Sequence, residues 1–131
     1  HSEYNESKVD PVHFLQIWIE PDTAGVTPEY SEKSFGEMPG GVLQLIASKG
    51  GRHDSISIHQ DADVYVAKLP EGQNLDHDFA DGRAGWVQLI EGELRVNGET
   101  LRSGDGASIS HAARARLPAT KAAHFLFFDL R

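Results

Sequence analysis

The sequence predicts an all-β protein with one main domain. Short runs of β-branched and aromatic residues recur along the chain, and turn signals separate them about every 8 to 12 residues. No long segment repeats its apolar residues with the helical period of about 3.6 residues. A length of 131 residues suits one ordinary domain. These observations favour an antiparallel sandwich or barrel.

The expected strands are short and separated by turns. They are placed at residues 13–20, 42–47, 56–58, 64–69, 86–90, 93–96 and 125–130. Asn97-Gly98 is the strongest hairpin signal in the chain, because both residue types accept the backbone of a two-residue turn. Glu91-Gly92 is interpreted as another tight turn. Ala112–Ala115 is the only helix candidate of note, and it is too short to trust.

The first strand stands apart from the others. In HFLQIWIE (residues 13–20), Leu15, Ile17 and Ile19 fall on one face and Trp18 falls on the other. Pro21 ends this strand, and a polar stretch with several prolines and glycines follows as far as residue 41. We therefore expect the strand at 13–20 to belong to a different layer from the rest of the fold.

Composition excludes several classes of protein. The chain has 20 Asp and Glu against 12 Lys and Arg, a net charge of −8 that disfavours nucleic acid as a partner. The sequence has no cysteine, which excludes disulfides and thiolate metal sites. Neither a membrane-spanning stretch nor a secretion signal is recognised, so a cytoplasmic location is expected. The chain starts without Met, which we interpret as a processed chain or part of a longer one.

Two sets of motifs carry a family resemblance. The stretch GWVQLIEGELRVNG at 85–98, followed by Gly104-Asp105, resembles a cupin hairpin. The opening HSEYN, then HFLQIWIEP and GVTPEY, resembles the pirin family of bicupins, in particular its quercetin 2,3-dioxygenase-like members. The resemblance implies a cupin double-stranded β-barrel of the jelly-roll type at 42–131. It also implies an interdomain linker at 21–41 and, at 1–20, a terminal strand of a preceding N-terminal cupin.

The same resemblance assigns a metal site. In pirin-like proteins the first cupin holds its metal with three histidines and one glutamate, and His1 and Glu3 match the last two of these ligands. Alternate residues of a strand point the same way, so both side chains can face one site. Nitrogen and oxygen ligands suit a divalent transition metal, with iron favoured and manganese, nickel or copper as alternatives. The resemblance implies a flavonol as the substrate, with the other two ligands upstream.

The second barrel departs from the metal-binding pattern of the family. Gly85 stands where a glutamate ligand would be, and the segment from Phe79 to Asp81 stands where the histidines would be. No histidine stands at residues 114–117, where a further ligand is expected. His77 has no partner two residues on, and we interpret it as a surface or loop residue. Residues 42–131 are therefore expected to hold no metal.

The sequence also allows other functions. We assign no catalytic and no cofactor-binding residue, because the chain lacks a cysteine, a nucleophile elbow and a phosphate-binding loop. The alternative function is a non-catalytic cupin module with a structural or protein-interaction role, and a sugar- or small-acid-binding cupin has only the fold to support it. His53 is expected in a turn. The apolar face of the strand at 13–20 predicts self-association or contact with the missing N-terminal cupin.

Overall fold

The computed structural model describes residues 2–131, and its regular structure is almost entirely β. A single 3₁₀ turn, η1 (Arg52–Asp54), is the only helical element among these residues. The strands are β1 (Gln44–Lys49), β2 (Ile56–Ile58), β3 (Ala62–Leu69), β4 (Asn74–Asp78), β5 (Ala84–Val96), β6 (Glu99–Arg102), β7 (Gly106–Ile109) and β8 (Arg114–Leu130). The predicted all-β class is confirmed. No helix in the described part of the chain is long and apolar enough to cross a membrane.

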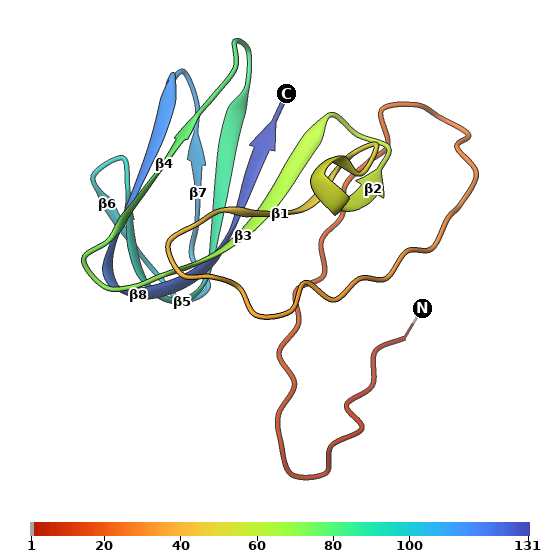
Figure 1. Cartoon of the computed structure of the whole chain (residues 1–131), viewed down its shortest axis with the longest axis horizontal. Helices are drawn as coiled ribbons and strands as arrows, with labels where there is room; N and C mark the ends of the chain where they lie inside the picture. Colours follow the sequence, from red (N-terminus) through yellow and green to blue (C-terminus); the bar gives the residue numbers. More distant parts are fainter. Residues whose placement is uncertain (1) are drawn as a thin grey trace.

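Two long strands organise the sheet. The strand order is β2-β1-β3-β8-β5-β6, with β4 added on β8 and β7 added on β5. β8 pairs with β4 through its first residues and with β3 through its last, while β5 runs antiparallel beside it. The strands curve round a common interior, and the chain before β1 runs outside them as extended backbone (Figure 1). This curved jelly-roll sheet, although not closed, fits a cupin.

The interior is filled by apolar side chains from β3, β5 and β8. Phe125 and Phe127 of β8 are fully buried against Leu89 and Val87 of β5. Burying one such side chain stabilises the fold by about 1.5–3 kcal/mol. Backbone hydrogen bonds between strands do not by themselves fix how far a sheet curves. The apolar side chains packed in the interior therefore determine the curved shape of the barrel.

The Asn97-Gly98 turn is confirmed, whereas the predicted Glu91-Gly92 turn is wrong. Val96 pairs with Glu99 across Asn97-Gly98, and both turn residues have positive φ. Gly92 instead lies inside β5, at a series of register shifts against β8, with φ of 92°. A bulge of this kind bends a strand without ending it. The two strands expected at 86–90 and 93–96 are therefore one bent strand.

The strand expected at 13–20 does not form a ladder. Its residues are extended but belong to no strand among those described. Ile19 packs on an outer apolar cluster of the sheet made by Val64, Val66, Leu126 and Phe128. Trp18, on the opposite face, is 87% exposed. Only Ile19 of the predicted inner face is packed, because Leu15 and Ile17 are 41% and 45% exposed. No neighbouring strand among the described residues supplies the hydrogen bonds of a ladder.

Candidate functional site

The predicted metal ligands lie in the N-terminal segment. His1 falls outside the described residues, and Glu3 is exposed in a part of the chain that runs away from the barrel (Figure 1). Within residues 2–131, no group of three or more His, Asp or Glu side chains is arranged to hold a metal ion. The assignment of His1 and Glu3 as ligands stays a prediction.

His77 lies inside the barrel, so its interpretation as a surface or loop residue is wrong. It belongs to β4, where Leu75 and His77 alternate with exposed residues, and its side chain is only 16% exposed. Its ring centroid lies 5.6 Å from that of Tyr65, 5.2 Å from that of Phe79 and 4.8 Å from that of Phe127. The imidazole is thus part of an aromatic cluster at the mouth of the barrel.

A buried carboxylate pairs with this imidazole. Asp129, near the end of β8, accepts a hydrogen bond from His77 Nε2 at 2.7 Å and another from Arg83 Nε. Arg83 also donates to Asp61 Oδ1 at 2.8 Å and to the Asp129 carbonyl oxygen at 2.8 Å. Burial alone would lower the pKa of Arg83, but hydrogen bonds to Asp61 and Asp129 outweigh burial and raise it. This polar chain joins β4, β8 and the segments before β3 and β5.

The position expected for a metal-binding glutamate is filled by a ring. A Cβ atom on Gly85 would lie 2.7 Å from Phe79 Cζ and 3.3 Å from Phe127 Cε2. Real Cβ contacts essentially never fall below 3.0 Å, so the Phe79 ring occupies the space that a side chain at residue 85 would need. The side chains at the mouth of this barrel therefore do not fit a metal centre of the family type.

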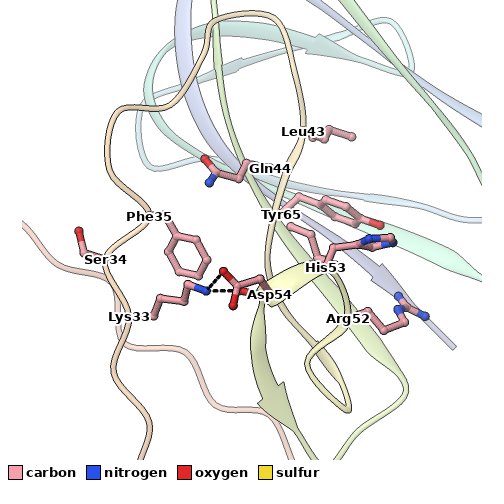
Figure 2. Close-up of a pocket in the computed structure, with 10 residues that line it drawn as sticks. Lys33, Ser34, Phe35, Leu43, Gln44, Arg52, His53, Asp54 and Tyr65 are labelled. Carbon is pink, nitrogen blue, oxygen red and sulfur yellow. Dashed lines mark hydrogen bonds and ion pairs between the residues drawn. The ribbon is translucent and has the colours of Figure 1, made fainter.

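A hollow of about 720 Å³ opens beside β1, and we call it the β1 hollow. The linker before β1, the η1 turn and β3 contribute its walls. Phe35, Gln44 and the Lys33–Asp54 ion pair lie on one side of β1, and Leu43, Tyr65 and His53 lie on the other (Figure 2). Among residues 2–131, Gln44 Oε1 is the one buried side-chain oxygen without a hydrogen-bond partner.

The η1 turn places His53 at this hollow through unusual backbone. His53 and Asp54 have φ of 50° and 63°, in the left-handed region that costs a residue with a Cβ about 1–2 kcal/mol. Buried Ser48 fixes the turn: its Oγ accepts a hydrogen bond from Arg52 N at 2.8 Å and lies 2.8 Å from Ser55 Oγ. Predicting a turn at His53 was correct, but the strain was not foreseen.

Tyr65 connects the β1 hollow with the buried polar chain. Its ring touches His77 and Phe127, and its hydroxyl lies 3.5 Å from Asp63 Oδ2. Burial raises the pKa of the Tyr65 hydroxyl, and the carboxylates of Asp63 and Asp129 raise it further. Tyr65 therefore stays a neutral hydrogen-bond donor at physiological pH.

Sequence reasoning missed the residues that meet at the barrel mouth. Leu75, His77 and Phe79 alternate with Asp76 and Asp78, a period-2 pattern that would have placed His77 on an inward face. No local signal pairs His77 with Asp129, which lies 52 positions away.

The chain is similar in sequence to a known cupin domain and to several known proteins. Residues 45–130 match the quercetinase C-terminal cupin domain. Quercetin 2,3-dioxygenase of Escherichia coli K12 is 34% identical over 130 residues, which is 99% of this chain and 55% of that protein. A putative quercetin 2,3-dioxygenase of Pasteurella multocida is 33% identical over 99% of this chain and 56% of that protein.

Solved structures give the same result. The crystal structure of YhhW from Escherichia coli superposes with a TM-score of 0.83 at 31% identity, covering 87% of this chain and 48% of that one. Bacterial pirin YhhW in complex with nickel(II) gives a TM-score of 0.78 at 29% identity, over 84% of this chain and 47% of that one. The chain spans about half the length of the curated relatives it matches. It therefore belongs to the pirin-like family of quercetinase C-terminal cupin domains.

Proposed function

We propose that the intact protein is a metal-dependent dioxygenase of the quercetin 2,3-dioxygenase type and that this chain is its largely metal-free C-terminal cupin portion. The match to quercetin 2,3-dioxygenases over 99% of this chain but only 55% of the relative is the observation that carries the proposal. The Phe79 ring beside Gly85 supports the division of labour, because it fills the place of a ligand in this barrel.

In this proposal His1 and Glu3 complete a metal site whose other ligands come from the preceding domain. An imidazole and a carboxylate suit divalent iron, manganese, nickel or copper, but two ligands do not hold such an ion selectively. The nickel complex of a pirin relative supports a transition metal in the intact protein. When bound, the metal would supply a site for the adjacent oxygens of a flavonol and for its reaction with dioxygen.

The rest of the chain would position that site. Residues 1–20 would belong to the N-terminal cupin, residues 21–41 would link the domains, and the barrel at 42–131 would support them. Trp18 at 87% exposed, Phe14 at 53% and Ile17 at 45% leave apolar side chains uncovered on both faces of this segment, and such a domain would cover them. In its absence we expect this chain to self-associate, which light scattering after size-exclusion chromatography would detect as a mass above that of one chain.

A cytoplasmic location agrees with the absence of cysteine, since a reducing compartment offers no disulfide stabilisation.

Oxygen consumption with quercetin tests the proposed activity. The intact protein should consume oxygen in a metal-dependent way, and this chain alone should not. Glu3→Ala in the intact protein should abolish the activity, while Glu6→Ala, an exposed glutamate of the same segment, should leave it unchanged. Equal activity in the Glu3→Ala protein would contradict the role of Glu3.

The second candidate is a non-catalytic cupin module with a structural or protein-interaction role. The apolar side chains that pack together in the barrel interior favour it for this chain. An intact protein that binds metal but does not consume oxygen with any flavonol would favour this candidate over the dioxygenase.

A further inference from the structure

The β1 hollow carries polar groups that the proposed dioxygenase function does not use. Its volume of about 720 Å³ lies in the range of small-molecule sites, about 300–1,000 Å³. Leu43, Tyr65 and His53 face the same side of β1 (Figure 2). Leu45 adds a further aliphatic lining residue. This side of the hollow therefore offers both apolar surface and hydrogen-bonding groups.

His53 is held at the hollow in a strained conformation without an internal partner. Its φ of 50° lies in the left-handed region, and within residues 2–131 its imidazole makes no hydrogen bond or ion pair. Asp54, the other strained residue of the turn, is accounted for by its ion pair with Lys33. Ser48 holds the backbone of the turn, but among the described residues no contact of the imidazole itself uses the strained position of His53. Strained positions of this kind cluster at ligand-binding sites.

The charges around the hollow cancel in pairs. Lys33 is paired with Asp54, and Arg52 is paired with Asp63. The polar groups left for a ligand are the imidazole of His53, the hydroxyl of Tyr65, whose own hydrogen bond to Asp63 is long at 3.5 Å, and, on the other side of β1, the unpaired Oε1 of Gln44. His53 and Tyr65 can each donate a hydrogen bond to a hydroxyl group or accept one from it.

We propose that the β1 hollow binds a small, neutral, hydroxylated aromatic molecule. Its ring would pack on Leu43, Leu45 and the ring of Tyr65, and its hydroxyl groups would hydrogen-bond with His53 and Tyr65. This site lies in the second barrel and needs no metal, so it stands or falls independently of the proposed dioxygenase activity.

Titration of this chain with catechol, followed by ¹H–¹⁵N NMR, tests the proposal. Saturable shifts are expected at residues 43–45, 52–54 and 65. Benzoate, which carries a charge, and glucose, which lacks an aromatic ring, should bind at least about tenfold more weakly, a difference of about 1.4 kcal/mol. Quercetin in place of catechol distinguishes a flavonol ligand from a simple phenol.

The variant His53→Gly separates binding from folding. Glycine adopts positive φ without strain, so this variant should melt at the same temperature or higher while its affinity for catechol falls at least about fivefold. His111→Gly is the matched control, because His111 also has positive φ, 56°, but lies outside the hollow. It should leave the affinity unchanged, and Tyr65→Phe should lower it.

Three results would overturn the proposal. They are the absence of saturable binding by any phenol, unchanged catechol affinity in His53→Gly, and tighter binding of benzoate than of catechol. The last result would make the hollow an anion site.

Discussion

His77 Nε2 lies 2.7 Å from Asp129 Oδ2 inside the barrel, and the same carboxylate accepts a hydrogen bond from Arg83. One buried carboxylate therefore connects β4, the start of β5 and the end of β8. The side chain of Asp129 is 7% exposed, so water replaces little of what these partners supply. Asp129 therefore provides the main electrostatic contact between these elements at the mouth of the barrel.

Asp129→Asn should destabilise the fold by about 3–5 kcal/mol, the usual result of removing one partner of a buried ion pair. An amide is neutral and turns an NH₂ group toward one of two donors, so His77 and Arg83 lose a charged partner, and Arg83 keeps only Asp61 as a carboxylate partner. Urea denaturation measures the change. Asp78→Asn, in an exposed pair with Arg114, should have a much smaller effect. Similar losses in both variants would contradict the special role of Asp129.

Gly85→Ala should cost about 1–3 kcal/mol, because the new methyl group overlaps the Phe79 ring. Adding Phe79→Leu should restore part of that loss, and a double-mutant cycle by chemical denaturation measures the coupling. Gly40→Ala is the control, since its nearest new contact, Pro70 Cδ, lies at an ordinary 3.6 Å. Additive effects of the substitutions at residues 79 and 85 would show that the ring does not fill this space.

Gly92 and Gly98 have nearly the same φ, 92° and 88°, but different surroundings. A Cβ at Gly92 would lie 1.8 Å from the Ala122 carbonyl oxygen, whereas a Cβ at Gly98 meets nothing within 4 Å. Gly98→Ala should therefore cost about 1–2 kcal/mol of backbone strain. Gly92→Ala should be far more damaging and give little folded protein, as thermal denaturation and circular dichroism would report. Equal melting temperatures would contradict this account of the bend in β5.

His124 should make stability depend on pH below about 6.5, the pKa of an unfolded histidine. Burial lowers the pKa of its imidazole, and nearby Lys68 and His13 lower it further, while Glu91 opposes them. The unfolded chain therefore binds more protons than the folded one between the folded pKa and about 6.5, and stability falls as pH decreases through this window. Urea denaturation of wild type and His124→Gln across this range measures the effect.

Lys68→Met should raise the pKa of His124 in an NMR titration, because it removes a repelling cation. An unchanged pKa in that variant, or an equal pH slope in His124→Gln, would contradict this cause.

Local patterns in the sequence predicted much of the fold. The runs of β-branched and aromatic residues at 56–58 and 64–69 and the Asn97-Gly98 turn predicted β2, β3 and the β5–β6 hairpin, because residue preference and turn chemistry are local properties. Gly92 was misjudged because a glycine in a bulge and a glycine in a turn look the same in sequence. Its role depends on Ala122, which reaches it only through the pairing of β5 with β8.

The candidate sites depend even more on long-range pairing. His77 meets Asp129 because β3 and β4 both pair with β8. No local feature of the sequence indicates either pairing. The strand expected at 13–20 failed for a related reason. Its alternating apolar residues suggested a strand, but a ladder needs a partner strand, and residues 13–20 have none among the described residues.

The account depends most directly on where the metal is held, and metal content per chain measures it. The intact protein and two variants would be purified and their bound transition metal quantified by mass spectrometry. Glu3→Ala should lose the metal, and His77→Ala should retain it. Full metal content in Glu3→Ala would contradict the role of Glu3, and loss of the metal in His77→Ala would place it in the second barrel and contradict the account.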